Sequence, residues 1–246
     1  MSVRALVLFD IDATLLKTDG AGMAAMESAG RELFGERFTT RGIDFAGSLD
    51  SILLRQMLRG CGVGPTGEAE QTFRRTYAWH LERRLSGPNA ARALPGALEL
   101  VRAVRSTADH AAGLLTGNFA ETGSLKLRAC GLDPSWFPIC AWGDDSPHDP
   151  PDREHLPPVA MRRFHAHFGR EVEPGRVTII GDTIHDVRCA RANGCRSVAV
   201  ATGKYSIPEL RASGADHVVA DLSATADILA LITGIAVPSA GPRGLS

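Results

Sequence analysis

The sequence predicts an α/β fold in which a doubly wound parallel sheet carries a helical domain inserted after its first strand. Residues 3–9 form a short, nearly all-apolar run, which is typical of a strand buried on both faces. Similar runs alternate with helical patterns in the second half of the chain. From about residue 20 to about residue 92, helical periodicity replaces strands altogether.

The second half of the chain supplies the alternation. Four apolar runs have the length of buried strands and cover residues 111–115, 177–180, 197–201 and 217–220. Helical patterns lie around and between them, at residues 98–104, 123–129, 159–168, 186–192, 208–212 and 224–232. Strands that alternate with helices of this size form βαβ units, so we expect a Rossmann-like parallel sheet with helices on both faces.

The inserted helical domain is predicted from apolar residues at helical spacing, around Met23 and Leu33, at 52–58, and from Phe73 to Leu85. Glycine- and proline-containing breaks separate these patterns. The expected division is therefore a helical domain at residues 20–92, a core domain at residues 1–19 and 93–234, and a flexible, Gly-, Pro- and Ser-rich tail at residues 235–246.

Composition excludes several classes of protein. Of 246 residues, 44% are hydrophobic and 22% charged, as in ordinary globular proteins. A net charge of -1 gives no basic field to attract nucleic acid or an acidic membrane, and no apolar run approaches the roughly 20 residues of a membrane span. The five cysteines match neither a zinc site nor a disulfide scaffold, and no cleavage site follows the N-terminus. We expect a cytoplasmic monomer or homodimer.

Two carboxylates follow the first predicted strand. Asp10 and Asp12 stand two residues apart, so both side chains project the same way if the chain stays extended. One carboxylate could attack a substrate while the other transfers protons, and a divalent metal would offset their repulsion. Aspartates that cap a helix or form a turn give the same pattern, so the pair alone leaves both interpretations open.

The ends of two later strands carry further polar groups. The Thr116 hydroxyl and the amides around Gly117 and Asn118 could donate to a phosphate oxygen, although an ordinary helix N-cap has the same composition. Another apolar strand ends in glycine and Asp182, with Asp186 four residues later. Such oxygen ligands suit Mg²⁺; the alternative is an N-cap aspartate followed by a solvated one.

A cation is expected near these carboxylates, because aspartates and phosphate together are strongly negative. Residues 144–158 form a polar loop that leads into a helix and contains Arg153, our candidate. A solvated surface arginine is the alternative. Lys126 competes for the position, but it lies on the helix after Thr116, where we expect it not to reach the centre.

Together, these positions resemble the sequence pattern of the haloacid dehalogenase (HAD) superfamily. That pattern is Asp-x-Asp-x-Thr after the first strand, Ser or Thr after the second, then Lys or Arg, and Gly-Asp-x-x-x-Asp near the end. The matching residues here are Asp10, Asp12, Thr14, Thr116, Arg153, Gly181, Asp182 and Asp186. The resemblance spans nearly the whole chain, and the insertion is similar to the helical cap of phosphoglycolate phosphatase-like members.

The resemblance implies a Mg²⁺-dependent phosphohydrolase acting on a small-molecule phosphate ester. Asp10 would attack phosphorus to form an aspartyl-phosphate, and Asp12 would protonate the leaving oxygen and then activate water. Mg²⁺ would be held by the Asp10 carboxylate, the Asp12 carbonyl and Asp182, with Asp186 supporting the metal shell. The phosphate oxygens would be held by Thr116, Gly117, Asn118 and Arg153.

Three positions depart from the family pattern, and the third, in the cap, makes substrate inference from relatives unsafe. Ala13 replaces the usual glycine, and Arg153 stands where lysine is commoner. In the cap, Ser48 and Leu49 differ from the residues that relatives often carry before the aspartate. Gly47 and Asp50 are our candidates for cap residues that face the substrate, and an N-cap role without substrate contact fits Asp50 equally well.

Other activities remain open on the same fold. A 2-haloacid dehalogenase would use Asp10 against carbon, but it needs neither Mg²⁺ nor Asp12. A phosphomutase would return the phosphate to the substrate, and the cap would decide between it and a hydrolase. A non-catalytic binding module is a further alternative, because fold does not fix function.

Overall fold

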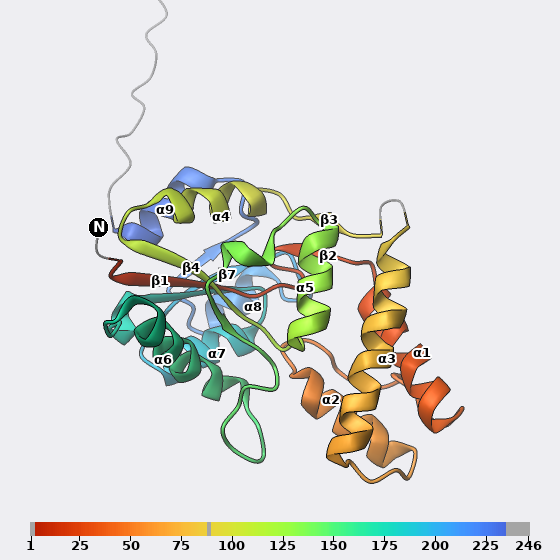
Figure 1. Ribbon diagram of the computed structural model, residues 1–246. Helices are drawn as coiled ribbons and strands as arrows, with labels where there is room; N and C mark the ends of the chain where they lie inside the picture. Colours follow the sequence, from red (N-terminus) through yellow and green to blue (C-terminus); the bar gives the residue numbers. More distant parts are fainter. Residues whose placement is uncertain (1–2, 88–89, 235–246) are drawn as a thin grey trace, which may run out of the picture.

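The computed structural model describes residues 3–87 and 90–234, so the predicted tail at residues 235–246 lies outside the described residues. A six-stranded parallel sheet forms the centre of the molecule, in the order β5-β4-β1-β6-β7-β8 (Figure 1). Its strands are β1 (Ala5–Phe9), β4 (His110–Leu115), β5 (Ile139–Ala141), β6 (Val177–Gly181), β7 (Arg196–Val200) and β8 (His217–Val219). The predicted α/β, Rossmann-like fold is confirmed.

Helices cover both faces of this sheet (Figure 1). On one face, α4 (Ala97–Ser106) and α9 (Thr225–Thr233) pack on each other and on the sheet. The opposite face is covered by α6 (Leu156–Phe168) and α7 (Ile184–Ala192), and α8 (Ile207–Ala212) packs beside β8. A strand between two helical layers is buried on both sides, which explains why β1 is entirely apolar.

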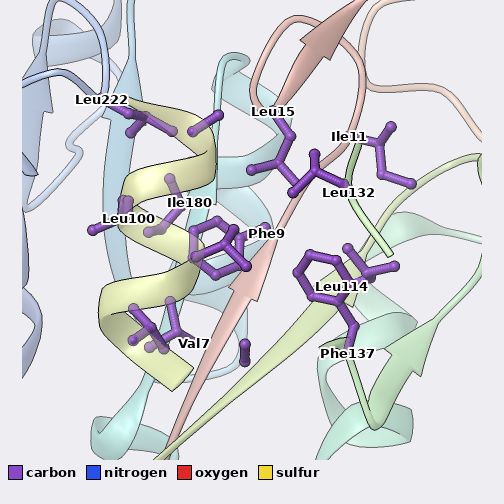
Figure 2. Close-up of a cluster of buried hydrophobic side chains, with 14 of the residues drawn as sticks. Val7, Phe9, Ile11, Leu15, Leu100, Leu114, Leu132, Phe137, Ile180 and Leu222 are labelled. Atoms are coloured by element: carbon purple, nitrogen blue, oxygen red, sulfur yellow. The ribbon is translucent and has the colours of Figure 1, made fainter. Parts of the chain in front are cut away.

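Side chains of β1 alternate between the two hydrophobic cores, as the two-residue period of a strand requires. Val7 and Phe9 belong to the core beneath α4 and α9, where Figure 2 shows them beside Leu100. Leu6 and Leu8 belong to the core beneath α6 and α7. The strand is thereby held on both faces, which fixes the position of the residues that follow it.

The register of the central strands aligns their carboxyl ends. Phe9 of β1 lies opposite Leu114 of β4 and Ile180 of β6. Polar residues that follow these strands therefore emerge at one edge of the sheet, beside the strand where the chain order reverses. Open parallel sheets bind their ligands at such an edge.

The inserted segment contains α1 (Ala21–Phe34), α2 (Asp50–Gly60) and α3 (Gly67–Leu85), which lie beyond the carboxyl edge of the sheet (Figure 1). They share a hydrophobic cluster of their own, which also takes in Phe119 before α5 (Ala120–Ala129). The two connections pair as antiparallel strands, β2 (Leu16–Lys17) and β3 (Arg92–Ala93). The paired connections and the separate cluster support our division into cap and core, which stays a prediction.

Several short elements were not predicted. Strand β5 has three residues and β2 and β3 have two each, too few to show a periodic pattern. Three 3-10 turns also appear, η1 (Pro134–Trp136), η2 (Arg153–His155) and η3 (Pro174–Arg176). Within residues 3–87 and 90–234, no helix combines the length and the apolar character needed to span a bilayer.

The packing of α1 gives a first testable prediction. A Cβ atom on Gly30 would lie 2.0 Å from Cδ1 of Phe38, whose ring also stacks on Phe34 and Phe73. We expect Gly30→Ala to lower the free energy of unfolding by roughly 1–3 kcal/mol, because the ring has no room to retreat. Urea denaturation measures this change.

Gly60 provides the matched control for this substitution. It is the last residue of α2, and a Cβ atom there would meet nothing within 4 Å. Gly60→Ala is expected to be neutral or stabilising, by up to about 1 kcal/mol. Equal effects of the two substitutions would contradict the packing argument.

Candidate active site

A cavity of about 410 Å³ lies between the carboxyl edge of the sheet and the inserted helices. Its walls come from the segment after β1, the cap loop before α2, the loop after β4 and the segment after β6. The cavity brings together most of the residues predicted for the site, namely Asp10, Asp12, Gly47, Asp50, Thr116, Gly117, Asn118, Arg153 and Asp182.

Three buried carboxylates form the deepest part of the site. Oxygen atoms of Asp10, Asp182 and Asp186 all lie within 4.8 Å of one another. Asp10 directly follows β1, and its backbone N–H donates to the carbonyl of Ile180 at 2.9 Å. Asp186 is fixed in the first turn of α7, where it accepts from the Thr183 hydroxyl at 2.7 Å and the Thr183 N–H at 3.1 Å.

The three carboxylates of Asp10, Asp182 and Asp186 give the site an excess of negative charge. Burial, together with the charges of Asp10 and Asp186, raises the pKa of Asp182 to about 8. Burial likewise raises the pKa of Asp10 to about 6, although the Arg153 guanidinium opposes this change. Asp182 accepts one hydrogen bond from the described residues, from the Thr14 hydroxyl at 3.3 Å. The group therefore calls for further positive charge beside Asp182.

Arg153 reaches these carboxylates from η2, as predicted for the cationic position. Its Nη2 lies 2.9 Å from Asp10 Oδ1 and 2.7 Å from Asp186 Oδ1, and it also donates to the Leu115 carbonyl at 3.3 Å. Burial alone would lower the pKa of Arg153, but Asp186 and Asp10 outweigh it and raise the pKa. Nε of Arg153 is buried and finds no partner among the described residues.

Lys126 also reaches the site, so the expectation that it would not is wrong. Its Nζ lies 2.7 Å from Asp12 Oδ2 and 2.6 Å from Asn118 Oδ1. Lys126 lies in the last turn of α5, and its long side chain extends back toward the helix start and the cavity. The two cations therefore serve different aspartates: Arg153 contacts Asp10 and Lys126 contacts Asp12.

The loop after β4 has donors that face the cavity. The Thr116 N–H bonds the Ala141 carbonyl at 3.1 Å, which holds the loop on β5. The Thr116 hydroxyl oxygen accepts from Asn118 Nδ2 at 2.8 Å, which leaves its own proton to be donated. Thr116 is not the N-cap of the following helix, because Phe119 takes that position.

Gly117 is required for close packing of backbones. A Cβ atom there would lie 1.9 Å from the Ser48 carbonyl oxygen of the cap loop. On the other side, a Cβ atom on Gly143 would lie 1.9 Å from the Gly117 carbonyl oxygen. Three segments from cap and core are thus in backbone contact at the rim of the cavity.

The two cap candidates both line the cavity. Gly47 has φ +69°, a conformation that favours glycine, and a Cβ atom there would lie 2.6 Å from the His185 ring. Asp50 is the first residue of α2 rather than its N-cap, which is Leu49. Its carboxylate accepts from the Phe119 N–H at 3.1 Å, and its own N–H donates to the Gly117 carbonyl at 2.7 Å.

Sequence reasoning missed several residues of the cavity wall. Lys17 and Lys204 lie at its rim, and Tyr77 approaches from α3. The side chain of Lys204 bonds Asp44 of the inserted segment at 2.7 Å. None of these residues belongs to a motif. They line the cavity because the inserted helices pack on the edge of the sheet.

One protein-family model matches a segment of the chain. Residues 156–225, which include β6 with Asp182 and α7 with Asp186, match the model described as HAD-hydrolase-like. The resemblance to HAD-like hydrolases is confirmed. The comparison with curated proteins gives no match.

Several solved structures share this fold over nearly the whole chain. A hydrolase from Pseudomonas syringae is 25% identical with a TM-score of 0.66, covering 95% of this chain and 100% of that one. CbbY from Rhodobacter sphaeroides in complex with phosphate is 21% identical with a TM-score of 0.70, covering 90% and 96%. A predicted phosphoglycolate phosphatase from Haemophilus somnus is 18% identical with a TM-score of 0.65, covering 93% and 99%.

The buried carboxylate of Asp50 predicts a pH dependence of stability. Burial raises its pKa to about 7, although Lys126 opposes the change. A carboxyl group whose pKa is raised on folding stabilises the folded state fully below its unfolded pKa, and this contribution is lost as the pH rises through the folded pKa. Between about pH 4 and 7 the loss is at most roughly 4 kcal/mol, at about 1.4 kcal/mol per pKa unit.

Asp50→Asn is expected to remove this part of the pH dependence, because an amide can still accept from the Phe119 N–H but does not ionise. Urea unfolding of both proteins at several pH values between about 4 and 8 measures the difference. Asp221→Asn is the control and should keep the slope, because hydrogen bonds from Ser223 lower the pKa of Asp221 instead of raising it. Parallel curves for wild type and Asp50→Asn would contradict the assignment.

Proposed function

We propose that the protein is a Mg²⁺-dependent phosphomonoesterase that acts on a small metabolite phosphate through an aspartyl-phosphate on Asp10. The observation that carries the proposal is the division of the two aspartates after β1. Asp10 lies in the buried acidic group beside Arg153, while Asp12 lies outside that group and pairs with Lys126. A nucleophile and a proton donor require such different surroundings.

The acidic group has the composition of a Mg²⁺ site. Its donors are carboxylate oxygens, which Mg²⁺ prefers, and Asp182 has no cationic partner within the described residues. The Asp10 and Asp182 carboxylates and the Asp12 carbonyl would hold the ion, and Asp186, already bonded to Thr183 and Arg153, would support them. When bound, Mg²⁺ would offset the carboxylate charge and the charge of the phosphoryl oxygens.

The chain's own residues account for the two chemical steps. In the first, Asp10 attacks phosphorus while Asp12 gives its proton to the departing ester oxygen. In the second, Asp12 takes a proton from the attacking water, and phosphate leaves Asp10. Arg153, the Thr116 hydroxyl and the amides of Gly117 and Asn118 would hold the non-bridging oxygens, whose charge the site must stabilise.

A small anionic metabolite fits the cavity. The volume of about 410 Å³ is near the lower end of ligand sites, and Lys17 and Lys204 place positive charge at its rim. CbbY binds phosphate and, as a mutant, xylulose-1,5-bisphosphate. By this likeness and the cap type, a two-carbon or sugar-sized phosphate such as phosphoglycolate is the substrate class we propose. Gly47 and Asp50 would contact it from the cap, in a cytoplasmic monomer or homodimer.

The first test of this function is phosphate release from p-nitrophenyl phosphate and a panel of metabolite phosphates, with and without Mg²⁺. We expect Mg²⁺-dependent release, and we expect Asp10→Asn to lower kcat by more than about 10³-fold, since the amide cannot form the covalent intermediate. Asp44→Asn, at the exposed aspartate paired with Lys204, is the charge-matched control and should stay within about tenfold of wild type.

Other outcomes of this assay distinguish the alternatives. Chloride release from 2-haloacids without phosphate release would identify a dehalogenase. Transfer of the phosphate between positions of a sugar phosphate would identify a mutase. Absence of activity in all assays despite Mg²⁺ binding would indicate a non-catalytic module and would contradict the proposed function.

Metal binding is tested separately by thermal unfolding. Mg²⁺ should raise the melting temperature of the wild type, because an ion at 100 times its Kd adds about 2.7 kcal/mol to the stability of the folded state. Asp182→Asn should abolish most of this increase. Without Mg²⁺ the same variant should be more stable than wild type near pH 8, since it removes a carboxyl group whose pKa is raised to about 8. Asp227→Asn, on the exposed side of α9, should behave like wild type.

A further inference from the structure

Lys126 is a buried cation whose partners both belong to the site. Its side chain is 7% exposed, and its Nζ contacts Asp12 Oδ2 and Asn118 Oδ1. The ammonium group lies under α1, because a Cβ atom on Gly22 would be 3.3 Å from it. A buried ammonium group needs partners of this kind, so its position is tied to theirs.

Lys126 also determines the orientation of the Asn118 amide. An ammonium group only donates, so the amide must turn its oxygen toward Lys126. The amide nitrogen then faces the other way, where it donates to Asp12 Oδ2 at 2.8 Å and to the Thr116 hydroxyl at 2.8 Å. Lys126 therefore acts on Asp12 twice, by direct contact and through Asn118.

These contacts fix one oxygen of Asp12 and leave the other free. Oδ2 accepts from both Lys126 and Asn118, whereas Oδ1 has no hydrogen bond to any residue that the structure describes. The Asp12 side chain is 45% exposed and lines the cavity. Asp12 follows the strand end on an irregular segment, so its side chain is held mainly from α5 and the loop before it.

We propose that Lys126 is a positioning residue that, together with Asn118, holds the Asp12 carboxyl group on the leaving-group side of the site. The inference rests on the proposed function. In the step concerned, the Asp10 oxygen–phosphorus bond forms, the phosphorus–ester oxygen bond breaks, and the Asp12 proton moves to that ester oxygen. The separate roles of the two cations follow: Arg153 stabilises the Asp10 side, and Lys126 places the proton donor.

A comparison of leaving groups separates the proposed role of Lys126 from a purely structural one, because only misplacement of the proton donor affects alkyl and aryl phosphates differently. An alkoxide needs protonation as it departs, whereas p-nitrophenolate leaves without it. The ratio kcat/KM reports the steps up to departure of the leaving group, so it is insensitive to the later attack by water. Misplacement of Asp12 should thus lower kcat/KM for alkyl phosphates far more than for p-nitrophenyl phosphate.

The experiment compares Lys126→Met with wild type on the best alkyl phosphate of the panel and on p-nitrophenyl phosphate. We expect kcat/KM to fall about 10²-fold with the alkyl phosphate, and by less than about fivefold with the aryl phosphate, since general acid catalysis contributes roughly 10²–10⁴-fold. In an Asp12→Asn background, Lys126→Met should cause no further loss with either substrate, because the group that it positions no longer donates a proton.

Arg128→Met is the matched control, since Arg128 is an exposed cation on the same helix, α5, and does not line the cavity. It should leave the ratio between the two substrates unchanged. Retained aryl phosphatase activity shows that Lys126→Met is folded; if that variant does not fold, Lys126→Gln replaces it. Equal losses with both substrates, or a further loss in the Asp12→Asn background, would overturn the inference. Inactivity of the wild type on every phosphate would overturn the proposed function instead.

Discussion

The site depends on an excess of buried negative charge at the ends of β1 and β6. Asp10, Asp182 and Asp186 converge there, and one guanidinium group, from Arg153, contacts two of them. The strand register and the capping interaction with Thr183 hold these carboxylates together in spite of their repulsion. The mutual repulsion of the carboxylates lowers the stability of the folded state, and a bound cation would relieve it.

The acidic group and the opposite wall of the cavity belong to two different parts of the structure. Both hydrophobic cores pack against β1, so Asp10 directly follows a strand that is held on both faces. The inserted helices have their own cluster and contribute the opposite wall of the cavity. The paired strands β2 and β3 connect the two parts.

The sequence predicted the sheet and the motif residues because both are encoded locally. Buried strands require apolar runs, and the carboxyl ends of parallel strands meet, which placed Asp10, Thr116 and Asp182 together. Lys126 could not be placed in this way, because its reach depends on the geometry of α5 and on the space left by Gly22. Ala13 shows a similar limit: its φ of +57° explains why glycine is usual there, which the residue type alone does not reveal. Strand β5 escaped prediction because three residues carry no period.

The backbone contact of Ser48, Gly117 and Gly143 limits which sequences could replace the cap of this protein. A lid grafted from another protein would have to place a backbone carbonyl at the position of Ser48, and the loops after β4 and β5 would have to keep Gly117 and Gly143. Cap and core are therefore not interchangeable modules, although they are separate in the sequence. Met23 and Met26 of α1 lie away from this backbone contact and reach the cavity with side chains, so substitutions there are less constrained.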